Sequence, residues 1–308
     1  MSVMRPIATD QPETAPLETF DGPAFEVLRA APAGSPPPTA LVFASPHSGG
    51  VYPPDMVAAA RLPVETLRAS EDAFVDRIVA GAPRLGAAVV RARFARAYVD
   101  LNREPWELDP AMFDETLPDY AHGRSARVAA GLGTIPRIAG EGRPIYARKL
   151  TFAEARDRVE LAHRPYHDAL DRQLAAARAA HGAAILIDWH SMPAAAARGQ
   201  KARGGGTCDI VLGDRFGAAC SPKLTSLVER ELEAMGYRVA RNAPYAGGYT
   251  TEHYGRPAKR THALQIEINR SLYMDEETRE PTDGLARVTA DAETLTRALA
   301  ALDVSELK

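Results

Sequence analysis

The chain has 308 residues, of which 45% are hydrophobic and 25% charged, and 37 basic against 40 acidic residues leave a net charge of −3. This composition is typical of a globular protein, and the near balance of charge gives no support for a nucleic acid or an anionic membrane as partner. With only two cysteines, Cys208 and Cys220, and an N-terminus that lacks a signal-peptide pattern, we expect a cytoplasmic protein.

Residues 1–20 are polar and rich in proline, which predicts a flexible N-terminal arm ahead of one domain over 21–308. Apolar runs that stop at polar residues predict strands, and apolar residues at helical spacing predict helices. The predicted strands are 40–45, 87–93, 97–101, 183–188, 208–212, 237–241 and 263–268, and the predicted helices are 63–81, 151–181, 221–235 and 285–301. Their alternation predicts an α/β fold, a three-layer α/β/α sandwich around a mixed, mostly parallel sheet.

Two segments stand outside this alternation. Residues 104–149 are rich in Pro, Gly and charge, and an excursion of this length is usually functional, so we expect it to shape a specificity pocket. Residues 242–256 are rich in Gly and Tyr, which suits a substrate lid with Gly247 and Gly248 as the hinge.

Two histidines follow apolar runs directly: His47 follows 39–44, and His190 follows 183–188. Ligands bind at the carboxyl ends of strands in open α/β sheets, so two histidines delivered there can share a divalent metal. Asp188 lies on the same face of its strand as His190 and is placed to orient that imidazole. The competing interpretation is a pair of ordinary structural histidines.

A catalytic zinc site needs a third protein ligand, and Glu71 and Asp72 offer adjacent carboxylates near the start of a helix. The residue pattern alone does not choose between them. A helix N-terminal acid stabilised by the helix dipole is the plainer interpretation.

A general base is expected on the predicted strand over 263–268. Gln265, Glu267 and Asn269 share one face of it, and a carboxylate among apolar strand neighbours is costly unless it is paired or functional. Glu267 is therefore the candidate base beside a metal-activated water, with the polar face of an edge strand as the alternative.

Another predicted strand ends in the segment from Asp100 to Arg103. We expect Arg103 to bind a substrate carboxylate through two parallel hydrogen bonds, supported by Asn102. An ordinary surface salt bridge is the alternative.

Short motifs in order between about residues 40 and 275 resemble the N-formylglutamate amidohydrolase (deformylase) family. They are Pro46-His47-Ser48-Gly49, Glu71-Asp72, Asp100-Leu101-Asn102-Arg103, Tyr166-His167, Asp188-Trp189-His190, Gly213-Asp214, Gly247-Gly248, His253-Tyr254-Gly255 and Gln265-Ile266-Glu267. The resemblance implies a zinc-carboxypeptidase-like fold and metal-dependent hydrolysis of an N-acyl amino acid, with N-formyl-L-glutamate as the leading substrate.

The resemblance also implies roles for individual residues. The ligands of one Zn²⁺ would be His47, Asp72 and His190, with Asp188 and Glu71 around them. Glu267 would be the base, and the substrate would be bound by Arg103, Asn102, Gly248, Tyr249 and Thr250.

Three other functions are weighed against this one. Residues 69–75 depart from the deformylase pattern, which favours as the first alternative a related zinc deacylase or carboxypeptidase-like hydrolase of another N-acyl amino acid. A metal-independent hydrolase with Ser48 or Ser191 as nucleophile is disfavoured because no nucleophile-elbow sequence is present. The third is a non-catalytic module that binds a small carboxylate through Arg103.

Overall fold

A computed structural model of the chain describes residues 22–29, 38–121, 123–140, 142–198 and 205–307. The arm expected at 1–20 lies outside these residues. Within the described part of the chain, no helix combines the length and apolar character that a membrane crossing requires.

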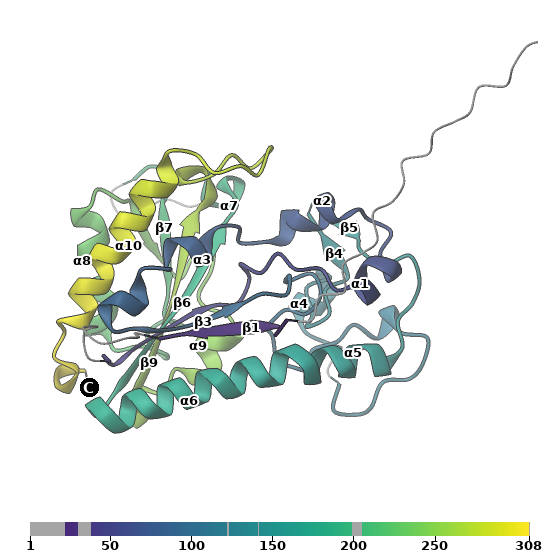
Figure 1. Cartoon of the computed structure of the whole chain (residues 1–308), viewed down its shortest axis with the longest axis horizontal. Coiled ribbons are helices and arrows are strands. Elements are labelled where there is room, and N and C mark those ends of the chain that lie inside the picture. Colours follow the sequence, from purple (N-terminus) through teal and green to yellow (C-terminus); the bar gives the residue numbers. More distant parts are fainter. Residues whose placement is uncertain (1–21, 30–37, 122, 141, 199–204, 308) are drawn as a thin grey trace, which may run out of the picture.

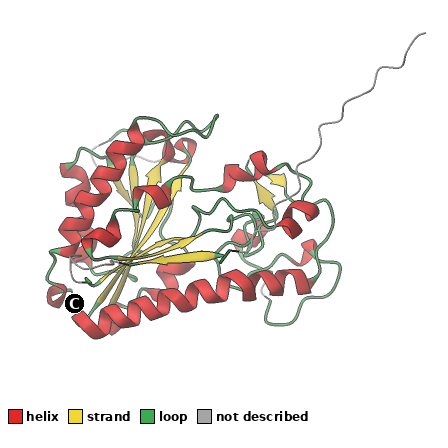
Figure 2. Ribbon diagram, in the orientation of Figure 1, coloured by secondary structure: helices red, strands yellow, loops and turns green. Residues whose placement is uncertain are grey.

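One seven-stranded sheet runs through the described residues between two layers of helices (Figure 2). Its strands are β1 (Phe25–Leu28), β2 (Leu41–Ser45), β3 (Ala88–Ala92), β6 (Ala184–Met192), β7 (Ile210–Gly213), β8 (Val239–Arg241) and β9 (Thr261–Asn269). They lie in the order β1-β3-β2-β6-β9-β7-β8. The pairs β1–β3 and β7–β9 are antiparallel and the other four are parallel, so the sheet is mixed and mostly parallel, as the sequence predicts.

The helices and a small antiparallel sheet complete the described structure. The helices are α1 (Pro54–Ala59), α2 (Val64–Leu67), α3 (Val75–Ile78), α4 (Ala126–Ala129), α5 (Phe152–Arg158), α6 (Arg164–His181), α7 (Ala194–Arg198), α8 (Pro222–Ala234), α9 (Tyr249–Tyr254) and α10 (Gly284–Ala300). The small sheet pairs β4 (Ile138–Ala139) with β5 (Arg143–Pro144). A π-helical turn at Val159–His163 joins α5 to α6, and Gly182 ends α6 in the left-handed conformation.

The two faces of the large sheet bury separate cores. Successive strand residues point to opposite faces, so Val42 and Leu186 enter one core while Phe43 and Ile187 enter the other. The first core is covered by α6 and α9, and the second by α3, α8 and α10 (Figure 1). The predicted three-layer sandwich is therefore confirmed.

The predicted and observed strands differ in two places. Residues 97–101 form a buried turn, because Tyr98 N donates to Ala95 O (2.9 Å) and Asp100 N donates to Thr134 O (2.8 Å) instead of pairing with the sheet. The edge strand β1 has no counterpart among the sequence predictions, since its four residues are too few and too little buried to give a clear pattern.

The helix predicted over 63–81 is interrupted at residues 71–74. Phe74 has a φ of 65°, in the left-handed region that side chains disfavour. Asp72 N donates to His47 O at 2.9 Å rather than to a helical carbonyl. The interruption therefore brings Asp72 beside His47.

Strand β6 is longer than predicted and positions the site. It extends to Met192, so His190 lies within the strand, on the same face as Asp188 and Leu186. Strand β9 runs parallel to it, and the register pairs His190 with Glu267.

Candidate active site

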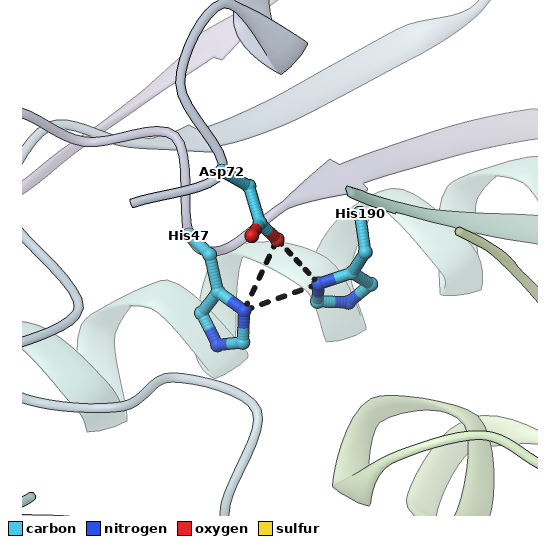
Figure 3. Close-up of side chains that lie close together, drawn as sticks. All are labelled: His47, Asp72 and His190. Atoms are coloured by element: carbon cyan, nitrogen blue, oxygen red, sulfur yellow. Dashed lines mark hydrogen bonds and ion pairs between the residues drawn. The ribbon is translucent and has the colours of Figure 1, made fainter. Parts of the chain in front are cut away.

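The carboxyl ends of β2 and β6 bring two histidines, His47 and His190, together with Asp72 from the interrupted helix, and these three side chains could hold a metal ion (Figure 3). His190 Nδ1 lies 3.1 Å from both His47 Nδ1 and Asp72 Oδ2, and His47 Nδ1 lies 3.4 Å from Asp72 Oδ2. All three side chains are buried. They form what we call the metal group: His47, Asp72 and His190.

Each imidazole of the metal group is oriented by a buried carboxylate. His47 Nε2 lies 2.7 Å from Asp100 Oδ1, and His190 Nε2 lies 3.0 Å from Asp188 Oδ2. A carboxylate accepts a hydrogen bond at this distance, so in the neutral rings Nε2 carries the proton and Nδ1 presents a lone pair. Two such lone pairs beside a carboxylate oxygen match the donors of a catalytic zinc site, which takes three protein ligands and keeps one position open.

The electrostatics of the metal group favour a bound cation. Burial opposes ionisation of Asp72, yet its hydrogen bonds with His190 and His47 hold its pKa well below the usual range. Burial likewise opposes a charged His190, yet Asp188 and Asp72 hold its pKa well above the usual range. The group thus attracts positive charge to its centre, a metal ion or, without one, a proton.

Arg270 holds the second oxygen of Asp72. Its Nη2 donates to Asp72 Oδ1 at 2.9 Å, and its Nε donates to Ser191 Oγ at 3.1 Å. These contacts leave Oδ2 of Asp72 facing the histidines. No role was predicted for Arg270, because its contacts with Asp72 and Ser191 form only when distant segments meet.

Glu71 points elsewhere. Its carboxylate accepts hydrogen bonds from Tyr52 Oη at 2.7 Å and Arg68 Nε at 3.5 Å, and burial raises its pKa. Of the two adjacent acids that the sequence offered, the structure brings Asp72 to the histidines.

Glu267 stands on β9 directly opposite His190 and is buried. Its Oε1 accepts a hydrogen bond from Gln265 Nε2 at 2.8 Å. Burial raises the pKa of Glu267 to about 7, and the negative charge of Asp72 adds to the rise against the opposing effect of His190. A carboxyl group with this pKa can both accept and return a proton near neutrality.

The segment from Asp100 to Arg103 supports both histidines. Asp100, for which no role was predicted, accepts a hydrogen bond from Arg96 Nε at 2.9 Å in addition to its contact with His47. Asn102 Nδ2 donates to Asp188 Oδ2 at 3.3 Å, and Asn102 Oδ1 accepts from Thr250 N at 2.7 Å. Buried polar contacts of this kind need tertiary neighbours that the local sequence does not reveal.

Arg103 lies on the wall of the cavity but is largely committed to the backbone. Its Nε donates to Leu132 O at 2.9 Å, and its Nη1 donates to Asn102 O at 2.8 Å. Burial lowers its pKa. Two of its three guanidinium nitrogens therefore donate to backbone carbonyls. The two parallel hydrogen bonds to a substrate carboxylate that the sequence predicts would require the Arg103 side chain to rearrange.

The predicted lid contains the helix α9. Gly248 N donates to Gln265 Oε1 at 2.7 Å, and a Cβ atom on Gly248 would lie 2.4 Å from Asn102 Nδ2, so glycine is required by close approach. Gly248 lines the cavity. Thr250 is fully buried, and the ring of Tyr249 stacks on His253 with centroids 5.0 Å apart.

A cavity of about 620 Å³ opens over the metal group. Glu267 and Gly248 lie on its boundary beside the metal group, and residues from the 104–149 excursion form part of its wall. The cavity is large enough for a small-molecule substrate.

The chain is similar to several known proteins. The sequence profile of the N-formylglutamate amidohydrolase family matches residues 39–274. The N-formylglutamate deformylase of Pseudomonas putida is 36% identical over 195 residues, 62% of this chain and 66% of that protein. The N-formylglutamate deformylase of Pseudomonas aeruginosa is 32% identical over 242 residues, 77% of this chain and 83% of that protein.

A solved structure extends the similarity to most of the fold. The crystal structure of N-formylglutamate amidohydrolase from Ralstonia eutropha JMP134 is 41% identical, with a TM-score of 0.82, and the match covers 90% of this chain and 97% of that one. The family profile spans every residue of the metal group together with Glu267. The chain therefore belongs to the N-formylglutamate amidohydrolase family.

Proposed function

We propose that this chain hydrolyses the amide bond of N-formyl-L-glutamate to formate and L-glutamate. The observation that carries the proposal is the convergence of His47, Asp72 and His190 in one buried group, with Glu267 opposite His190 on the neighbouring strand. The names of the Pseudomonas relatives and of the Ralstonia structure support this substrate.

Zn²⁺ is the proposed cofactor, held by His47, Asp72 and His190. Asp100 and Asp188 hold the two imidazoles, and Arg270 holds Asp72, so the three ligand atoms face one point. A divalent ion held by these residues would lower the pKa of a water molecule to roughly 7 and would polarise the amide carbonyl.

Glu267 is the proposed general base. It takes a proton from the attacking water while the water oxygen bonds to the formyl carbon. It then gives that proton to the amide nitrogen as the C–N bond breaks, so the oxygen leaves in formate and the nitrogen leaves as the amine of glutamate. Its pKa of about 7, which burial sets, suits both transfers.

The remaining proposed residues position the substrate. Arg103, with Asn102 beside it, binds the α-carboxylate through the guanidinium nitrogen that the backbone contacts leave over. Gly248 lets the substrate approach the backbone at the start of α9, and Tyr249 and Thr250 form the helical turn behind it. We expect the reaction to take place in the cytoplasm, since Cys208 and Cys220 are both free thiols.

The test is a substrate panel with zinc-loaded protein. We would measure the release of the acid from N-formyl-, N-acetyl- and N-succinyl-L-glutamate and from N-formyl-L-methionine. The highest kcat/KM is expected for N-formyl-L-glutamate. A preference for the acetyl or succinyl compound would move the function to a related deacylase, and no release from any of them would contradict amide hydrolysis.

A further inference from the structure

Five arginines line the cavity, and within the described residues four of them are bound to partners in the chain. Those four are Arg96 on Asp100, Arg103 on the carbonyls of Leu132 and Asn102, Arg215 on Glu252, and Arg270 on Asp72 and Ser191. Each of them therefore has at least one donor committed to the chain itself.

Arg127 differs from these four. It lies on α4 in the 104–149 excursion, is half-buried and lines the same cavity. Among the described residues its guanidinium has neither a hydrogen bond nor an ion pair. An arginine without a partner at the edge of a cavity has donors available for an anionic ligand.

The helix that carries Arg127 is held in place. Ser125 caps it by accepting a hydrogen bond from Val128 N at 3.1 Å, and Ser125 Oγ also donates to the buried carboxylate of Glu107. Arg127 is therefore presented by a braced turn rather than by a free loop.

The same turn is connected to Arg103. Arg103 Nε donates to Leu132 O at 2.9 Å, and Leu132 N donates to Arg127 O at 2.9 Å. Two cations thus lie on one wall: Arg103, which donates to backbone carbonyls, and Arg127, which does not. A ligand with two carboxylates would match this wall better than a ligand with one.

The rest of this wall is apolar. Arg127 is the charged residue among those described that the excursion contributes to the cavity, and the others include Leu132, Pro136, Ile138 and Ala139. A guanidinium next to apolar side chains attracts a carboxylate more strongly than one in open water does. The apolar side chains would meanwhile pack against the methylene groups of a substrate side chain.

We propose that Arg127 binds the side-chain carboxylate of the substrate and thereby selects N-acyl amino acids with an acidic side chain. The proposal rests on the function proposed above and assigns the choice of amino acid to a specific residue. Arg127 is a specificity-determining residue and takes no part in the transfer of protons.

The test compares zinc-loaded wild type, Arg127→Met and Arg124→Met on N-formyl-L-glutamate and N-formyl-L-glutamine. The two substrates have nearly the same shape and differ in side-chain charge. Arg124 is an exposed cation outside the cavity, so its variant is the matched control for net charge.

Arg127→Met should lower kcat/KM for the glutamate compound roughly 10- to 100-fold, mainly through KM, and change kcat/KM for the glutamine compound less than about twofold. Arg124→Met should change neither.

An equal loss of kcat/KM on both substrates in Arg127→Met would show a merely structural role and would overturn the proposal. An unchanged preference of this variant for the glutamate compound would also overturn it. A binding measurement in the Glu267→Gln background separates this inference from the proposed hydrolysis. Absence of formate release by wild type would contradict the proposed hydrolysis. The role of Arg127 would still be supported if Glu267→Gln binds N-formyl-L-glutamate more tightly than N-formyl-L-glutamine and Arg127→Met removes that difference. If the two ligands bind equally well, the inference falls whatever the activity.

Discussion

The floor and the wall of the cavity are built in opposite ways. The floor, which consists of the metal group and Glu267, has a polar partner for every side chain: Asp100 for His47, Arg270 for Asp72, Asp188 for His190 and Gln265 for Glu267. The part of the wall that the excursion forms, which consists of Arg127, Leu132, Pro136, Ile138 and Ala139, contains one cation, and among the described residues this cation has no partner.

If the floor carries the proposed reaction and the wall the proposed selection, the two properties can be changed separately. The floor lies on the central strands or is hydrogen-bonded to them, as suits the proposed metal site. The wall belongs to an excursion outside the large sheet. Substitutions in the floor should therefore reduce the rate with every substrate, whereas substitutions in the wall should change which substrate is preferred.

The largest effect is expected when the floor loses a metal ligand. His190→Ala and Asp72→Asn should each abolish stoichiometric zinc and bring the hydrolysis of N-formyl-L-glutamate below detection, because two ligands hold a catalytic metal poorly. Metal analysis and formate release measure both. His181→Ala removes an exposed histidine and should change neither quantity, and full zinc content in His190→Ala would contradict the assignment.

The next effect is expected from the proposed base. Glu267→Gln should lower kcat about 10²- to 10⁴-fold while the zinc content stays complete, because the variant removes proton transfer and leaves the ligands. The exposed variant Glu233→Gln serves as control. A Glu267→Gln enzyme with wild-type kcat would show that another group transfers the proton.

A smaller effect is expected one contact away from the metal. Asp100→Asn should weaken zinc affinity about 10- to 100-fold, because the amide no longer fixes the His47 imidazole as an anionic acceptor does. Zinc titration calorimetry would measure the change, with the exposed Asp119→Asn as the comparison. An affinity equal to that of wild type would mean that Asp100 only supports the chain.

The smallest effect concerns the stability of the metal-free protein. The carboxyl of Glu267 has its folded pKa raised to about 7 from 4.5, so between these pH values the folded state holds a proton that the unfolded chain has lost. This carboxyl therefore stabilises the fold least above pH 7. From pH 5 to pH 8, the free energy of unfolding of Glu267→Gln should rise relative to wild type by on the order of 1 to 3 kcal/mol. Denaturant titration at the two pH values measures it, and a constant difference would show that the pKa is not raised.

Much of the fold is predictable from local pattern. The apolar patterns of several segments are clear enough to predict their secondary structure without knowledge of tertiary contacts. These segments are β2, β6, β9, α6, α8 and α10. The break at residues 71–74 escapes such reasoning, because it depends on a hydrogen bond from Asp72 N to His47 O.

The site divides in the same manner. His47, His190 and Glu267 were predicted because each ends or interrupts an apolar strand pattern. Asp100 and Arg270 acquire their contacts only when distant segments meet, so nothing local distinguishes them from ordinary charged residues. Likewise, only the folded structure shows that the guanidinium of Arg127 has no partner among the described residues.

The most direct test of the metal-dependent reaction is a zinc reconstitution assay. Protein stripped of metal by a chelator would be assayed with N-formyl-L-glutamate before and after the addition of one equivalent of Zn²⁺. We expect no formate release before the addition and full activity at one equivalent, with no further gain from a second. Undiminished activity in the metal-free protein would contradict the assignment of His47, Asp72 and His190 as the catalytic metal site.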